Sequence, residues 1–175
     1  RTNTRPLTCT RSRYIRTCIA PVLQLLDSQI HTTTKMSSHP APGIYRLQSA
    51  ARPTQYVSCM EGKIVGYSSE EELPDEWDFK LHEGLLATFE AIRDGKPSGL
   101  YISFQGESLI CSEAKSFFVV EESPPAPGLY TIKVHGFVDC DVWALLSWDN
   151  GTPVSIQLDT GSTQELWVFE AGNPV

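Results

Sequence analysis

Gly128-Leu129-Tyr130-Thr131-Ile132 opens the last third of the chain, and Leu166-Trp167-Val168-Phe169-Glu170 closes it. The first stretch has an aromatic residue at its centre, and the second alternates around a tryptophan. Both patterns are typical of strands that bury one face. Together they frame a unit that begins at a glycine and ends on a large aromatic side chain.

Two earlier parts of the chain repeat this arrangement. Gly43-Ile44-Tyr45-Arg46-Leu47 leads to Trp77-Asp78-Phe79-Lys80-Leu81, and Gly84-Leu85-Leu86-Ala87-Thr88 leads to Phe118-Val119-Val120-Glu121. The three opening glycines are separated by 41 and 44 positions. A period of this size indicates a repeat architecture, in which each unit buries its apolar face only against the other units.

Turn signals divide each repeat into four short strands. The central turns are Glu61-Gly62, Gln105-Gly106-Glu107 and Asp149-Asn150-Gly151. We therefore predict an all-β fold, a β-trefoil of three four-stranded repeats at about 43–83, 84–127 and 128–175. Each repeat gives two strands to a six-stranded barrel and two to a cap of hairpins.

The aromatic residues that close the repeats are the predicted centre of the core. We expect Trp77, Phe118 and Trp167 at equivalent buried positions. A β-sandwich is the alternative all-β architecture, but it does not predict a threefold period.

Charge divides the chain into two parts. Residues 1–35 carry a net charge of +5, and residues 36–175 carry −12. We predict a disordered basic leader over 1–35 and a β-trefoil domain over 36–175. Because the first methionine is Met36, we favour a leader that is not native protein; the alternative is an organellar transit peptide, which the basic, Ser/Thr-rich composition also fits.

The acidic part of the chain argues against nucleic acid or an anionic membrane as a partner, since both require basic patches. No apolar run approaches the roughly 20 residues that cross a bilayer. Cys59, Cys111 and Cys140 fall one per repeat without CxxC spacing, which indicates reduced thiols. We expect a cytoplasmic monomer.

Catalytic motifs have little support in this sequence. The histidines form no HExxH or other ligand spacing, and there is no GxSxG stretch. We interpret Cys140 and His135 as a buried thiol and a surface histidine rather than a catalytic pair. We therefore predict that the protein is not an enzyme and has no catalytic residues, no metal and no cofactor.

Rigid loops on a trefoil suit protease inhibition, because a loop held in a substrate-like form loses little entropy on binding. The first candidate loop is Met60, Glu61, Gly62 and Lys63, in which Lys63 would enter the acidic specificity pocket of a trypsin-like enzyme. Two reserve loops also carry basic residues. They contain Arg52 and Pro53, and Arg93, Asp94 and Lys96.

The strand motifs resemble those of the fungal β-trefoil serine protease inhibitors, small cytosolic mushroom proteins. The matching residues are Met36-Ser37, Pro42-Gly43-Ile44-Tyr45, Gly128-Leu129-Tyr130-Thr131-Ile132 and Leu166-Trp167-Val168-Phe169. The resemblance covers 36–175 and implies a defensive inhibitor of a serine endopeptidase, its partner, with Lys63 in the inhibitory loop. Fungal mycocypin-type cysteine protease inhibitors are more distantly similar, although Arg93-Asp94-Gly95-Lys96 lacks the Asn that some of them use.

Ricin-B-like lectins are also similar trefoils, and their repeats close with Gln-x-Trp. Gln164-Glu165-Leu166-Trp167 is one residue too long for that signature, but Trp143 or Trp148 could offer an exposed face for a sugar. We expect an inhibitor of trypsin-like serine endopeptidases. A carbohydrate-binding trefoil is the alternative, and a cysteine protease inhibitor is the second alternative.

Overall fold

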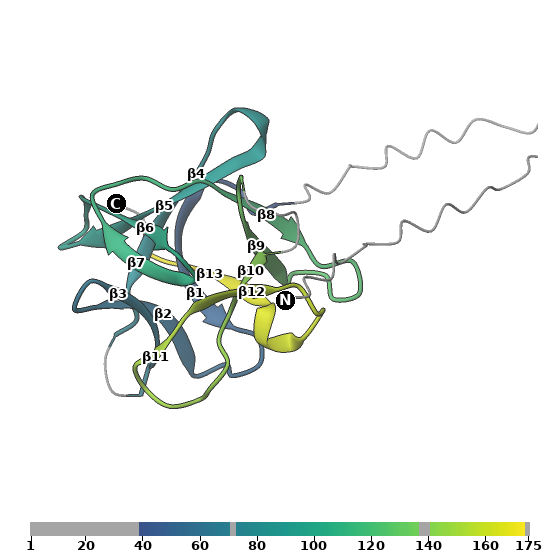
Figure 1. Ribbon diagram of the computed structural model, residues 1–175. Helices are drawn as coiled ribbons and strands as arrows, with labels where there is room; N and C mark the ends of the chain where they lie inside the picture. Colours follow the sequence, from purple (N-terminus) through teal and green to yellow (C-terminus); the bar gives the residue numbers. More distant parts are fainter. Residues whose placement is uncertain (1–38, 71–72, 137–140, 174–175) are drawn as a thin grey trace, which may run out of the picture. The chain divides into compact units, whose positions relative to one another are not determined.

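Short strands form most of the part of the chain that the structure describes, residues 39–70, 73–136 and 141–173 (Figure 1). The structure is a computed structural model. The predicted leader over 1–35 lies outside these residues, as does Cys140. The described residues contain thirteen strands and two 3-10 helices of three residues each, which confirms the all-β prediction.

Connections between the strands are short. In chain order the elements are β1 (Gly43–Ser49), β2 (Gln55–Met60), β3 (Lys63–Ser68), β4 (Glu76–Leu81), η1 (Glu83–Leu85), β5 (Leu86–Arg93), β6 (Lys96–Gln105), β7 (Ser108–Ser112), β8 (Phe118–Glu122), β9 (Tyr130–Val134), β10 (Asp141–Ala144), β11 (Thr152–Pro153), β12 (Ser155–Leu158), η2 (Thr163–Glu165) and β13 (Trp167–Ala171).

Six strands close into a ring. β1 pairs with β4, β4 with β5, β5 with β8, β8 with β9, β9 with β13, and β13 returns to β1, all antiparallel. Closure pairs both sides of every strand in the ring, so the ring itself has no free edge. The predicted six-stranded barrel is therefore present.

The hairpins β2–β3, β6–β7 and the β10–β12 pair meet one another beside the ring. Lys63 is paired with Ile110, and Ser155 with Ser108. The two-residue strand β11 joins β3 through Thr152 and Gly66. The hairpins of distant parts of the chain thus form one continuous hydrogen-bonded sheet with the barrel.

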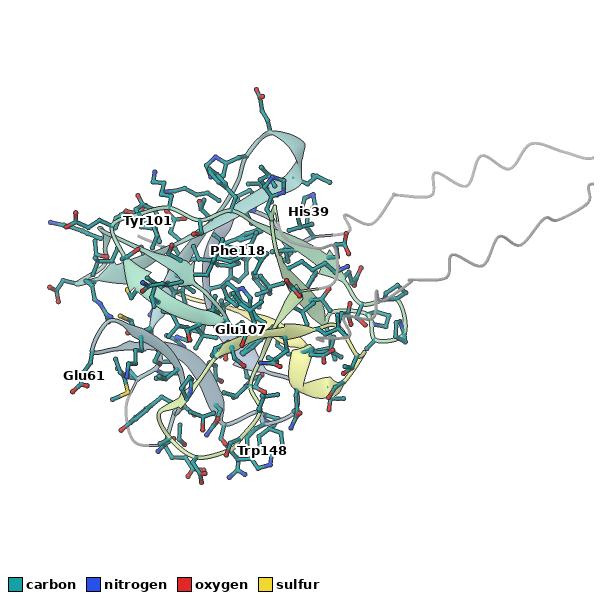
Figure 2. The ribbon with its side chains drawn as sticks, in the orientation of Figure 1. His39, Glu61, Tyr101, Glu107, Phe118 and Trp148 are labelled. Carbon is teal, nitrogen blue, oxygen red and sulfur yellow. The ribbon has the colours of Figure 1, made fainter. Side chains whose placement is uncertain are left out.

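Aromatic side chains fill the interior. Trp77, Phe118 and Trp167 are each 0% exposed, as predicted. Figure 2 shows Phe118 inside the ring of strands. The indole Nε1 of Trp77 donates to the Val57 carbonyl at 3.1 Å, and that of Trp167 donates to the Trp143 carbonyl at 3.2 Å. These two indoles therefore have the partner that a buried polar atom needs, whereas the buried Trp143 Nε1 has none among the described residues.

The sequence pattern also predicts one strand over 141–148 and a polar loop over 93–98, and both of these boundaries are wrong. The strand predicted over 141–148 ends at Ala144, because the Leu145 N–H donates to Gln164 on η2 at 3.0 Å instead of continuing a strand ladder. The polar loop predicted over 93–98 is a two-residue turn, because β6 already begins at Lys96.

Candidate functional site

The first predicted site, Met60 to Lys63, is the tight end of the β2–β3 hairpin. Met60 and Lys63 form the last pair of the ladder, and Glu61 and Gly62 have φ values of 51° and 76°. Two successive residues in the left-handed region are typical of a two-residue hairpin turn. Figure 2 shows Glu61 at the edge of the body. This turn cannot present the extended backbone that a substrate-like loop requires.

The predicted reserve loop between β5 and β6 has the same form. Arg93 is paired with Lys96, and the φ values of Asp94 and Gly95 are 51° and 70°. The Arg93 guanidinium is ion-paired with Asp75. This turn is also not extended, and its arginine is already engaged within the protein.

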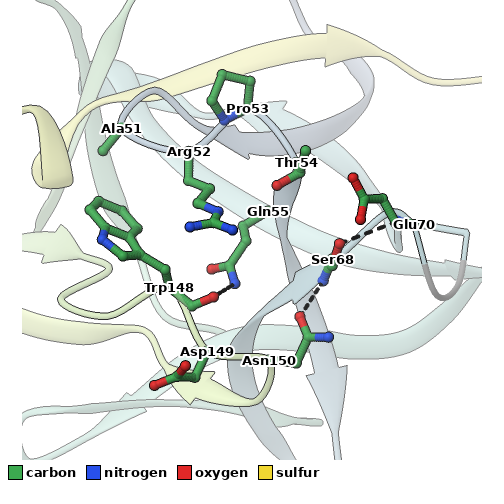
Figure 3. A pocket seen from close by; sticks show the side chains of 10 residues that line it. All are labelled: Ala51, Arg52, Pro53, Thr54, Gln55, Ser68, Glu70, Trp148, Asp149 and Asn150. Atoms are coloured by element: carbon green, nitrogen blue, oxygen red, sulfur yellow. Dashed lines mark hydrogen bonds between the residues drawn. The ribbon is translucent and has the colours of Figure 1, made fainter.

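Arg52 and Pro53 lie elsewhere, in the wall of a surface pocket of about 490 Å³ (Figure 3). We call it the Trp148 pocket. Its lining residues come from the β1–β2 connection, the end of β3 and the loop after β10: Ala51, Arg52, Pro53, Thr54, Gln55, Ser68, Glu70, Trp148, Asp149 and Asn150. The first and last thirds of the chain therefore build it together.

Three hydrogen bonds fix the loop that carries Trp148 to the β2–β3 hairpin. The buried Gln55 side chain donates from Nε2 to the Trp148 carbonyl. The Gly151 N–H donates to the Gly66 carbonyl at 3.0 Å, and the Ser68 N–H donates to Asn150 Oδ1 at 2.8 Å. The predicted Asp149-Asn150-Gly151 turn is confirmed, and its position is set by a strand about 80 residues earlier.

Gly66 makes this close approach possible. A Cβ atom there would lie 2.7 and 2.8 Å from the Leu145 methyl carbons and 2.9 Å from Gln55 Oε1. Real Cβ atoms essentially never come so near to other heavy atoms. The residue type at position 66 therefore lets the loop that carries Trp148 pack onto β3.

Trp148 is the tryptophan with an exposed face. Its side chain is 39% exposed, whereas Trp77, Trp143 and Trp167 are 0% exposed. The sequence left open which of Trp143 and Trp148 faces solvent, and the structure places Trp143 in the core. An exposed indole at a surface pocket is a flat apolar platform with a single donor.

Polar groups surround this platform. Figure 3 shows the Arg52 side chain reaching into the pocket between the Trp148 ring and Gln55. Asp149 Oδ2 accepts from Ser147 at 3.0 Å. Within residues 39–70, 73–136 and 141–173, the Arg52 guanidinium and the Asn150 Nδ2 amide have no hydrogen-bond partner. These groups remain available to a ligand.

The described residues contain no cluster of three or more His, Cys, Asp or Glu side chains that could hold a metal ion. Among the same residues, no helix has the length and hydropathy needed to cross a bilayer.

Comparison with solved structures supports the β-trefoil fold. A ricin B-like lectin of Macrolepiota procera, solved in complex with lactose, is similar with a TM-score of 0.60 and 16% identity, over 79% of this chain and all of that one. The Rhizoctonia solani agglutinin has a TM-score of 0.60 and 19% identity over 76% and 97% of the two chains. ThreeFoil, a designed threefold-symmetric protein, has a TM-score of 0.60 and 13% identity over 74% and 99%. No protein-family model and no curated protein matches the sequence.

The protease-inhibitor prediction, for serine and for cysteine proteases, is wrong. Two of the similar structures are described as a lectin and an agglutinin, and no inhibitor is found among the similar proteins reported above. The geometry agrees, because the Met60–Lys63 and Arg93–Lys96 loops are tight left-handed turns. Of the predicted loop residues, Arg52 and Pro53 are the ones that lie at the Trp148 pocket.

Proposed function

We propose that the protein binds carbohydrate in the Trp148 pocket. The observation that carries this proposal is the exposed Trp148 indole, held beside unpaired polar groups in a concave site. A pyranose ring has one face of C–H groups and a rim of hydroxyls. Such a ligand matches a flat aromatic platform bordered by donors and acceptors.

The polar groups of the pocket include both donors and an acceptor for the hydroxyl groups of a sugar. The Asn150 amide nitrogen and the Arg52 guanidinium donate to hydroxyl oxygens, and the Asp149 carboxylate accepts from hydroxyl hydrogens. The Asn150 oxygen is already occupied by the Ser68 N–H, so its nitrogen is fixed as the outward-facing donor. Gln55 is a positioning residue, because its amide holds the backbone of Trp148 rather than the ligand.

Rigidity of the site favours binding of a small ligand. The Trp148 loop is fixed by Gln55, Gly66 and Ser68, and the Arg52 carbonyl accepts from the Gln55 N–H at 2.9 Å. Both walls are therefore ordered before the ligand arrives, which reduces the entropy lost on binding. The likeness to a lectin solved with lactose and to an agglutinin supports the same function.

A glycan array probed with the full chain tests the proposal. We expect reproducible binding that a free sugar competes, and we expect Trp148→Ala to weaken it tenfold or more, since truncating a central aromatic contact costs about 2 kcal/mol. Phe117→Ala is the matched control, because Phe117 is 38% exposed and lies outside the pocket. Binding by none of the glycans, or equal loss in both variants, would refute the proposal.

We further propose that the body consists of three four-stranded repeats, β1–β4, β5–β8 and β9–β13. In support, each unit gives two strands to the ring, and the Trp77 and Trp167 indoles make matching bonds to the second strand of their own units. In the third unit, β11 and β12 count as one strand interrupted at Val154, whose N–H donates to Ile64 at 2.9 Å.

The sequence patterns support three further proposals about this lectin. It binds without chemical turnover, acts as a monomer, and resides in the cytoplasm. The net charge of −12 over residues 36–175 favours glycans over nucleic acid or an anionic membrane as partners.

A further inference from the structure

Cys59 and Cys111 lie together although 52 positions separate them in the sequence. Cys59 is on β2, one residue before the hairpin turn, and Cys111 is on β7. β3 lies between the two strands, since Cys59 is paired with Ile64 on one side of it and Lys63 is paired with Ile110 on the other. The Cys111 N–H donates to the Gly62 carbonyl in the turn at 2.9 Å.

Both cysteines are free thiols of intermediate exposure, and their side chains interact directly. Cys59 also lines a surface pocket of about 110 Å³ together with Met60, Asp75 and Arg93. Cys59 therefore borders a surface pocket that a small reagent can enter.

The groups next to Cys59 favour its thiolate over its thiol. The hydrogen bond from the Cys111 thiol is the largest influence; together with the nearby Arg93 guanidinium it outweighs burial and lowers the pKa of Cys59 to about 7. Asp75 opposes this effect, but it is ion-paired with Arg93 and accepts from the Cys59 N–H at 2.7 Å. The pKa of Cys111 is raised, because it donates to Cys59 and is partly buried.

We propose that Cys59 and Cys111 form an oxidisable thiol pair, which a peroxide converts to a disulfide linking β2 of the first repeat to β7 of the second. Cys59 is the attacking thiolate and Cys111 the resolving thiol. Neither cysteine lines the Trp148 pocket, and the proposal does not depend on carbohydrate binding.

The reaction balances with hydrogen peroxide as the oxidant. The Cys59 thiolate attacks one peroxide oxygen, the O–O bond breaks, and the released hydroxide takes a proton to become water. Cys59 is then a sulfenic acid. The Cys111 sulfur attacks the Cys59 sulfur, the S–O bond breaks, and the hydroxyl leaves with the Cys111 proton as a second water. The two thiols together lose two electrons, and one hydrogen peroxide gains them and is reduced to two waters.

The product is expected to be more stable than the reduced protein. A bridge between positions 59 and 111 closes a long loop and restricts the unfolded chain more than the folded one. We expect Tm to rise by on the order of 10 °C on oxidation and to return on reduction with dithiothreitol.

Peptide mapping of the full chain tests the proposal directly. The protein is treated with one equivalent of hydrogen peroxide, its remaining thiols are alkylated, and it is digested with trypsin. Cleavage after Arg46, Lys63, Arg93 and Lys115 places the two cysteines on peptides 47–63 and 94–115, since Arg52 and Lys96 each precede a proline. We expect these two peptides joined by a disulfide as the main oxidised product.

Three comparisons complete the test. With Cys111→Ser we expect no cross-link and a Cys59 sulfenic acid that dimedone traps, whereas Cys140→Ser leaves the cross-link unchanged. Alkylation of Cys59 should accelerate with pH around a midpoint near 7. Circular dichroism checks that each variant folds. Oxidation that leaves peptides 47–63 and 94–115 unlinked, or that joins Cys59 mainly to Cys9, Cys18 or Cys140, would overturn the proposal.

Discussion

Trp148 and Trp167 show how the same side chain serves two purposes in this protein. Trp167 is 0% exposed and its indole donates to the Trp143 carbonyl at 3.2 Å, so it belongs to the core. Trp148 is 39% exposed, and within the described part of the chain its hydrogen bond is the one that its backbone carbonyl accepts from Gln55. Their difference in burial predicts a difference in the cost of replacing each of them.

Trp167→Phe should lower the free energy of unfolding by about 2 kcal/mol or more, because it leaves the buried Trp143 carbonyl without its donor and opens a cavity. Trp148→Phe should change it by less than about 0.5 kcal/mol, as expected of an exposed site. Urea unfolding followed by circular dichroism measures both values. Equal effects of the two substitutions would contradict this assignment of core and site.

Gly66 and Gly62 lie on the same hairpin but are glycines for different reasons. At Gly66 a Cβ would meet Leu145 and Gln55 at under 3.0 Å. At Gly62 nothing lies within 4 Å of such a Cβ, but φ is 76°. The first position permits close packing of two elements, and the second permits a turn.

Gly66→Ala should lower the free energy of unfolding by about 2 kcal/mol and also weaken sugar binding, since displacing Gln55 releases the Trp148 loop. Gly62→Ala should cost about 1 kcal/mol through backbone strain alone and leave sugar binding unchanged. Thermal unfolding and glycan binding of the two variants measure these effects. Unchanged affinity in Gly66→Ala would show that the Gln55 contact does not position Trp148.

The strands and turns could be predicted from the sequence where the local residue pattern alone determines them. Alternation predicted the strands around Trp77 and Trp167, and the Asn150-Gly151 pair predicted its turn. The strand predicted through Trp148 instead stops at Ala144, where Leu145 turns to Gln164 on η2. That bond joins segments whose proximity depends on the whole fold, which no local pattern records.

At the scale of the whole molecule, both sites join residues that are distant in the sequence and that meet only when the strands pair into one sheet. The Trp148 pocket combines Arg52, between β1 and β2, with Trp148, which follows β10, and the thiol pair combines Cys59 on β2 with Cys111 on β7. The sequence predicted an exposed face on one of two tryptophans and one free cysteine per repeat. Which residues lie beside Trp148 and Cys59 depends on the register between hairpins, for example the pairing of Lys63 with Ile110. The sequence does not specify this register.

The most direct test of carbohydrate binding is a ¹H–¹⁵N NMR titration of the full chain with lactose and with any sugar that the array identifies. The four tryptophans give four indole signals, and three of these residues are 0% exposed. We predict that the sugar shifts the Trp148 indole and Asn150 side-chain amide signals, in proportion to occupancy. Shifts confined to another face, or no shift with any of these sugars, would contradict the assignment of the Trp148 pocket as the carbohydrate site.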